Sequence, residues 1–124
     1  MTLTIDGIDC SYGSVEILKD IDFEVKSGQF LGILGPNGSG KTTLLKSISK
    51  VLKPKKGAIL IDDTDIYKMK NLDLAKQMAV VPQSSPVSFD FTSLEVVLMG
   101  RNPHMTRFKM EGQSDFDIAK NAMK

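Results

Sequence analysis

The sequence predicts an α/β fold in which a parallel core sheet adjoins an antiparallel sheet, and two observations support this prediction. Residues 30–34 form a short apolar run, typical of a parallel strand buried on both faces. Residues 42–52 then place leucine, isoleucine and valine at helical spacing, so the two segments form a strand–loop–helix unit. Residues 2–6 and 20–25 instead alternate apolar and polar side chains, as strands of a half-exposed antiparallel sheet do.

The composition is that of a globular protein of one domain, or part of one. The chain has 124 residues, of which 41% are hydrophobic and 25% charged. Its net charge of +1 does not indicate binding to nucleic acid or to an acidic membrane. The single cysteine, Cys10, suits a reducing compartment, and we expect it to be a small buried side chain. No apolar run approaches the ~20 residues that span a bilayer, and the N-terminus does not read as a signal peptide.

In the segment before the strand–loop–helix unit, Ile21, Phe23 and Val25 should face inward while the intervening acids face solvent. Tyr12 lies in the turn-rich stretch between the two alternating strands. Two interpretations of Tyr12 stay open at this point. Its ring stacks on an adenine base, because a base offers a flat π-face, or it packs at a sheet edge.

The loop of the strand–loop–helix unit carries the strongest motif. Residues 35–42 (GPNGSGKT) match the phosphate-binding pattern G-x-x-x-x-G-K-[ST] at every fixed position. The glycines let backbone N–H groups turn inward around phosphate oxygens, and the start of the following helix adds partial positive charge. Lys41 supplies a cation for the β- and γ-phosphates, and the Thr42 hydroxyl can ligate Mg²⁺.

After the helix, a turn at residues 53–57 leads into a strand at 58–61 that ends in two acids. An apolar strand followed by an acid also resembles the second, Mg²⁺-linked motif of phosphate-loop proteins. The strand is short and follows the helix at once, however. We therefore expect Asp62 and Asp63 to be solvated acids of a hairpin-like arm.

A second candidate core strand lies at residues 78–82, after a short helix at 71–77 for which Asn71 is a good N-cap. Gln83 follows this strand directly. Ligands of open α/β sheets bind beyond the ends of the strands, so the Gln83 amide could bind Mg²⁺ or orient a water. The alternative of a polar loop residue stays open on spacing alone.

The remaining residues predict a loop and two helices. The loop at 84–91 carries Val87, Phe89 and Phe91, which anchor it to the body of the protein or dock a partner. Thr92 and Glu95 form a capping box for a helix that we expect to end at Gly100.

The only histidine, His104, follows a proline and is expected at the surface. A final helix should start with Ser114 as its cap and place Phe116, Ala119, Lys120 and Met123 at helical spacing.

Taken together, these motifs resemble the ATP-binding subunit of ABC transporters over essentially the whole chain. Tyr12 lies where that family has its adenine-stacking aromatic, and residues 35–43 (GPNGSGKTT) are close to its Walker A sequence. Residues 57–61 resemble its β-arm strand, which supports the hairpin interpretation of the two acids. Residues 81–83 look like its Q-loop. Residues 95–104 are similar to the importer ATPases for iron–siderophore complexes, haem and cobalamin, which often carry a G-R-x-P-[HY] segment.

The resemblance implies a P-loop NTPase fold of the ABC type, of which residues 1–124 are a partial domain. Residues 1–83 would be the core with Walker A and Q-loop, and 84–124 the start of the helical subdomain. The implied cofactors are ATP and Mg²⁺, with Lys41 and Gln83 in catalytic roles and Thr42 and Gln83 as metal ligands. The implied nucleotide-binding residues are Tyr12, Gly35, Pro36, Asn37, Gly38, Ser39, Gly40, Lys41, Thr42 and Thr43.

The implied partners are transmembrane permease subunits of an importer and a second ATP-binding subunit, with no nucleic acid. The protein would then lie at the cytoplasmic face of the cell membrane. In the family, an LSGGQ signature, a Walker B Asp, a catalytic Glu and a switch His complete hydrolysis. These motifs are not among the 124 residues, and His104 is not the switch His. We therefore expect very slow turnover, because phosphoryl transfer needs several groups at once.

We also expect marginal stability or association, because core strands beside Leu34 and Val80 would be uncovered. Two other functions remain open on the sequence. One is a truncated nucleotide-binding module without turnover, and the other is an ABC-type ATPase that serves no transporter.

Overall fold

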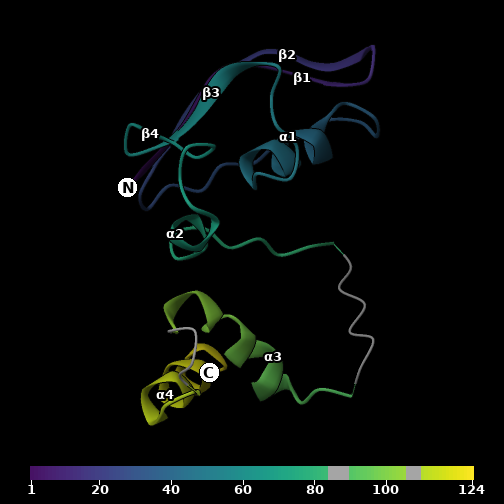
Figure 1. The fold of residues 1–124 in the computed structure, drawn as a ribbon. Helices are drawn as coiled ribbons and strands as arrows, with labels where there is room; N and C mark the ends of the chain where they lie inside the picture. Colours follow the sequence, from purple (N-terminus) through teal and green to yellow (C-terminus); the bar gives the residue numbers. More distant parts are fainter. Residues whose placement is uncertain (84–89, 106–109) are drawn as a thin grey trace. The chain divides into compact units, whose positions relative to one another are not determined.

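The computed structural model describes residues 1–83, 90–105 and 110–124. These residues form two compact units, Met1–Lys70 and Asn71–Lys124. The first unit contains a sheet and one helix, and the second contains short helices (Figure 1). Val87 and Phe89, which were expected to anchor a loop or dock a partner, lie outside the described residues.

The sheet of the first unit has four strands in the order β2-β1-β3-β4, and all of its pairings are antiparallel. The strands are β1 (Thr2–Tyr12), β2 (Val15–Lys26), β3 (Lys56–Ile61) and β4 (Thr64–Asp65). The predicted antiparallel sheet is therefore confirmed, with its first two strands longer than their alternating stretches. The sheet contributes the core residues Ile5, Ile8, Cys10, Ile59 and Ile61, which are buried.

The hairpin predicted after residue 61 is present. Ile61 pairs with Thr64, so Asp62 and Asp63 form the two-residue turn between β3 and β4. Both have positive φ angles, 44° and 64°, which two-residue hairpin turns of the primed type require. The Asp62 side chain accepts a hydrogen bond from the Thr2 N–H at 2.6 Å, so this acid links the β3–β4 turn to the start of β1.

Helix α1 (Lys41–Ile48) begins where the sequence predicts but ends before residue 52, and of the expected apolar positions it buries Leu44. Its buried residues are Thr43, Leu44 and Ser47, whereas Leu45 is exposed. Thr43 and Ser47 lie one turn apart and are small enough to let the helix approach the sheet closely. The polarity of the Ser47 side chain is satisfied locally, because its hydroxyl donates to the Thr43 carbonyl oxygen at 3.0 Å.

The two parallel core strands predicted at residues 30–34 and 78–82 are not strands in the structure. Phe30 is 100% exposed, and Leu34 and Val81 are each 95% exposed. A parallel strand needs hydrogen-bonding neighbours and cover on both faces. The described residues supply no such neighbour to either segment, so both remain without regular structure.

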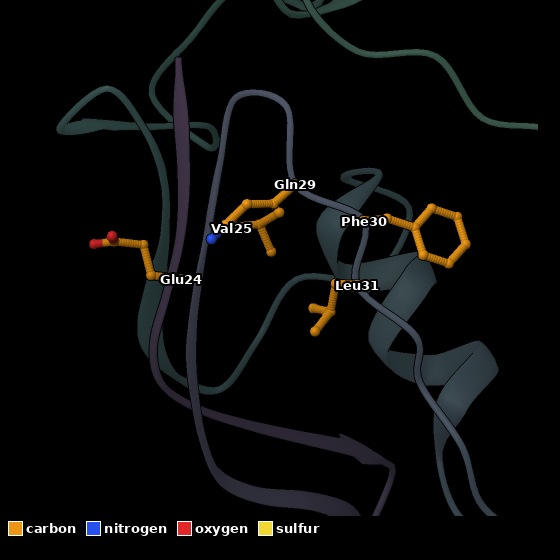
Figure 2. Close-up of a pocket in the computed structure, with 5 residues that line it drawn as sticks. All are labelled: Glu24, Val25, Gln29, Phe30 and Leu31. Atoms are coloured by element: carbon orange, nitrogen blue, oxygen red, sulfur yellow. The ribbon is translucent and has the colours of Figure 1, made fainter.

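A hollow of about 270 Å³ lies where residues 29–31 leave the end of β2. Figure 2 shows that the Phe30 ring points away from Val25, on the other side of this hollow. Glu24 also lines the hollow, but its carboxylate points away from the other four lining side chains (Figure 2). The hollow is therefore a consequence of the exposed 30–34 segment and contains none of the predicted site residues.

The second unit contains α2 (Asn71–Ala75), α3 (Ser93–Met99), a short 3₁₀ helix η1 (Asn102–His104) and α4 (Gln113–Ala122). α3 and α4 pack against each other. His104 is exposed, as predicted. No helix among the residues that the structure describes is long and apolar enough to cross a membrane.

An ion pair joins the residue before η1 to the first turn of α4. The Arg101 Nε atom lies 2.9 Å from Asp115 Oδ1, and both side chains are half-buried. Asp115 also accepts a hydrogen bond from the Gly112 N–H at 3.1 Å. The Asp115 carboxylate, in the first turn of α4, thus accepts from the backbone N–H of the residue just before the helix. Gly112 is the N-cap, and the predicted cap at Ser114 is wrong.

The capping box predicted for α3 is confirmed. The Thr92 N–H and hydroxyl each donate to Glu95 Oε2 at 2.7 Å, and the Glu95 N–H donates back to Thr92 Oγ1. The side-chain and backbone hydrogen bonds from Thr92 lower the pKa of the Glu95 carboxyl. Hydrogen bonds to an ionised carboxylate favour its charged form, which is the direction observed.

We expect the capping box to weaken as the pH falls through the lowered pKa of Glu95. Its contribution is fully present above the ordinary carboxyl pKa of about 4.3, because the ionised group accepts the two bonds. An NMR titration of the Glu95 carboxyl should give a midpoint below that value, and Thr92→Val should raise it. An unchanged midpoint in Thr92→Val would show that the hydrogen bonds do not set the pKa.

Candidate functional site

The loop at residues 35–40 owes its shape to its glycines, two of which have backbone angles that would strain any other residue. Gly38 and Gly40 have φ angles of 84° and 92°, in the left-handed region that favours glycine. A Cβ atom on Gly40 would lie 2.6 Å from Leu18 Cδ2, and one on Gly35 would lie 2.6 Å from Ser39 Oγ. The glycines therefore let the loop close on itself and pack against β2.

The Lys41 ammonium group lies across this loop. Its Nζ atom donates to the carbonyl oxygens of Gly35 and Pro36, each at 2.7 Å, and lies 3.3 Å from Ser39 Oγ. These contacts bring a full positive charge to the side of the loop where the helix begins. A phosphate group could replace the neutral carbonyl partners, because its negative charge attracts the ammonium group more strongly than a carbonyl oxygen does.

The first turn of α1 adds donors to the same place. Gly40 is the N-cap and makes no side-chain hydrogen bond. The N–H groups of Lys41, Thr42 and Thr43 precede the first intrahelical bond, which Leu44 makes to Gly40 at 2.9 Å. Three free N–H groups, a helix dipole and one ammonium group fit an anionic phosphate chain.

Mg²⁺ fits the same end of the helix through a hydroxyl group. Thr42 is exposed, whereas Thr43 is buried against the sheet, so Thr42 is the hydroxyl available to a cation beside a bound phosphate. No group of three or more histidine, cysteine or acidic side chains within residues 1–83, 90–105 and 110–124 is arranged to hold a metal by itself. A cation at Thr42 would therefore depend on phosphate oxygens for most of its ligands, as Mg²⁺ at phosphate sites does.

Tyr12 ends β1 in the same unit as the loop and is 47% exposed. The Lys46 Nζ atom of α1 lies over its ring, 5.9 Å from the centroid. The sequence had no motif that singles out Lys46. The adenine-stacking role of Tyr12 remains a prediction.

The structure thus places Tyr12 and residues 35–43 in one unit, whereas Gln83 belongs to the other. Gln83 is exposed and lies in a segment without regular structure. Its predicted contacts with Mg²⁺ and water remain predictions.

Two sets of contacts that hold α1 in place, one buried and one part-buried, were not visible in the sequence. Cys10 is fully buried, as expected, and its Sγ atom lies 3.1 Å from Ser47 Oγ. The Tyr67 hydroxyl lies 2.6 Å from the Leu52 carbonyl oxygen and 3.0 Å from that of Ser47. Burial raises the pKa of Tyr67 to about 12, so the hydroxyl stays a neutral donor at the end of the helix.

A protein-family model described as ABC transporter matches residues 18–124. An uncharacterised ABC transporter ATP-binding protein of Methanocaldococcus jannaschii is 50% identical over 105 residues, which are 85% of this chain and 41% of that protein. The cobalamin import ATP-binding protein of Halobacterium salinarum is 39% identical over 87% of this chain and 27% of its own length. The hemin import ATP-binding protein of Myxococcus xanthus is 38% identical over 99% of this chain and 45% of its own length. The chain spans less than half the length of these relatives.

Solved structures show the same likeness. A bacterial Atm1-family ABC exporter with ATP bound superposes with a TM-score of 0.76 at 31% identity, over 98% of this chain and 20% of that chain. An ATP-binding subunit of an ABC transporter gives a TM-score of 0.72 at 26% identity, over 86% of this chain and 45% of that chain. One of these structures is an exporter, so the likeness in fold does not select a direction of transport.

Proposed function

The chain belongs to the ABC transporter ATP-binding family, and from this premise we propose that it holds Mg-ATP for the ATP-binding subunit of an importer. The observation that carries the proposal is the Lys41 ammonium group, which lies at the glycine loop beside the free N–H groups of the first turn of α1. Bound Mg²⁺ would neutralise phosphate charge, with Thr42 as its protein ligand. Lys41 and the first-turn N–H groups would hold the β- and γ-phosphates.

The transported substrate that fits best is a metal chelate, meaning an iron–siderophore complex, haem or cobalamin. Relatives that match most of this chain are named for the import of cobalamin and hemin. A third, from Bacillus anthracis, is named for petrobactin import and is 36% identical over 91% of this chain. The segment at residues 95–104, which resembles the same importers, supports this choice.

An importer ATPase works at the cytoplasmic face of the membrane with permease subunits and a second ATP-binding subunit. We propose these partners for this chain. Gln83 would sense the bound Mg-ATP and pass its state to the permease through the residues that follow. Hydrolysis coupled to transport belongs to that assembly.

Isolation of the protein from membranes of its own cells tests the proposal. We expect a multi-span permease to co-purify, and we expect the complex in lipid vesicles to hydrolyse Mg-ATP and to take up one of the three chelates. ATP binding without any permease would instead favour a nucleotide-binding module or an ABC-type ATPase outside transport. Absence of ATP binding at every Mg²⁺ concentration would contradict the proposal, because every other part of it depends on bound Mg-ATP.

A further inference from the structure

We propose that Lys46 is a positioning residue of the nucleotide site, whose ammonium group fixes the Tyr12 ring and leaves its other face open to a base. This inference rests on the proposed function, because the base is that of the nucleotide held at residues 35–43. The Lys46 Nζ atom lies 5.9 Å from the ring centroid. At such distances a cation is attracted to the negative face of an aromatic ring.

The Tyr12 ring needs such a restraint. Tyr12 is the last residue of β1, directly before the turn at Gly13 and Ser14, and it is 47% exposed. A half-exposed ring at a strand end is free to change rotamer, and ordering it on binding costs affinity. An ammonium group on one face reduces that cost because the ring is already oriented.

Lys46 is free to serve this purpose. It is exposed on α1 and makes no ion pair within the part of the chain that the structure describes. Among those residues, the Tyr12 ring is the partner that its ammonium group contacts. Its charge is therefore not committed to a carboxylate that would draw it away from the ring.

A buried contact fixes the two partners relative to each other. Ser47, the neighbour of Lys46, is fully buried, and its Oγ atom lies 3.1 Å from the Sγ atom of Cys10. Cys10 in turn precedes Tyr12 by two residues on β1. The helix and the strand thus meet beside the Lys46–Tyr12 pair, so the ring and the cation are held on a rigid base.

The same helix links this pair to the phosphate loop. Lys46 follows Lys41 by five residues, which is about 7.5 Å along the axis of an α-helix. In this proposal, a nucleotide with its phosphates at the start of α1 places its base on the face of the Tyr12 ring that Lys46 does not cover. Stacking of a base on an aromatic ring is a substantial and sequence-tolerant interaction.

The test compares a ligand that has a base with one that lacks it. Lys46→Gln should weaken Mg-ATP binding by about threefold, the size expected for an exposed cation–π contact. Binding of inorganic tripolyphosphate should not change, because it has no base to stack. Lys46→Arg should restore ATP affinity, and in Tyr12→Leu the Lys46→Gln change should have no further effect. Lys70→Gln, which removes an exposed lysine of the same unit, is the matched control.

A spectroscopic measurement without nucleotide tests the positioning itself. The chain has two tyrosines and no tryptophan, so tyrosine fluorescence reports Tyr12 and Tyr67 alone. We expect its anisotropy to fall in Lys46→Gln, because the Tyr12 ring gains freedom, and to recover in Lys46→Arg. A reduction in general stability would not be rescued in this way.

Three results would overturn the inference, and they separate it from the proposed function. Equal weakening of ATP and tripolyphosphate in Lys46→Gln would show that Lys46 acts on phosphate. If Lys46→Gln leaves ATP binding unchanged while Lys41→Ala abolishes it, Lys46 does not position Tyr12. The proposed function would then still hold. A wild-type protein that binds neither ligand would remove both.

Discussion

Lys41→Ala should weaken Mg-ATP binding by about 10- to 100-fold. This is the largest change in nucleotide affinity that we expect from any single substitution in the protein. This range follows from the charge-assisted hydrogen bonds that an ammonium group makes to phosphate, at about 1.5–3 kcal/mol. The lysine is already held at the loop by the carbonyl oxygens of Gly35 and Pro36. Its charge therefore needs only a small movement to reach a phosphate, and alanine cannot supply it.

Isothermal titration of the purified protein with Mg-ATP measures this loss, with tripolyphosphate as a second ligand. Both affinities should fall together, since Lys41 acts on the phosphates that the two ligands share. Lys70→Ala is the charge-matched control and should leave both unchanged. The hydrogen bonds that Lys41 makes in the protein are exposed, so its removal should change the free energy of unfolding by no more than about 1 kcal/mol. Undiminished ATP affinity in a folded Lys41→Ala protein would place the nucleotide elsewhere.

The parts of this fold that the sequence predicts correctly are those governed by local rules. The glycine loop and the start of α1 follow from one motif in which each residue type has a backbone reason. The capping box at Thr92 and Glu95 and the turn at Asp62 and Asp63 are likewise decided within four residues. Such features need no distant partner, so they can be predicted without knowing the rest of the chain.

The predictions of parallel strands at residues 30–34 and 78–82 were wrong because such strands depend on distant partners. Their apolar composition indicates burial, but a strand forms only where other strands supply hydrogen bonds and cover. Local sequence does not specify those partners. The Phe30 and Val81 side chains are exposed, so an apolar run does not become a buried strand unless other strands pair with it and cover it.

Contacts between distant residues were also beyond sequence reasoning. Ser47 reads as a polar position of an amphipathic helix, yet it is buried because Cys10 and the Thr43 carbonyl oxygen satisfy its hydroxyl. Lys46 and Tyr12 are 34 positions apart (46 − 12), and no spacing rule connects them. The local geometry of the glycine loop was thus predictable, whereas the contact between Lys46 and Tyr12 was not.

Gly57→Ala should destabilise the first unit by about 2–5 kcal/mol, which is a large part of the 5–15 kcal/mol that usually stabilises a domain. Gly57 lies near the start of β3 with a φ angle of 76°, where an L residue is strained. A Cβ atom there would also overlap the carbonyl oxygens of Asp6 and Gly7 on β1. These are backbone atoms, so no side-chain rotation can relieve the contact.

The pairing between β1 and β3 explains why the backbone cannot move aside. Asp6 pairs with Ala58 and Asp9 with Lys56, so β1 carries an extra residue opposite Gly57. Gly7, inside this irregularity, has a positive φ angle of 52°. The two strands therefore approach each other where both are glycine, and a shift of either would break the ladder that aligns the rest of the sheet.

Gly28→Ala separates the two causes, because Gly28 has a φ angle of 81° but a Cβ atom added to it would meet nothing within 4 Å. It should carry the backbone strain alone, about 1–2 kcal/mol. The difference between the two variants is then the cost of the overlap with β1. Urea unfolding followed by tyrosine fluorescence measures it, since both tyrosines lie in the first unit and the chain has no tryptophan. Equal losses in the two variants would mean that β1 yields to the added methyl group and that the close approach at Gly57 is not required by the sheet.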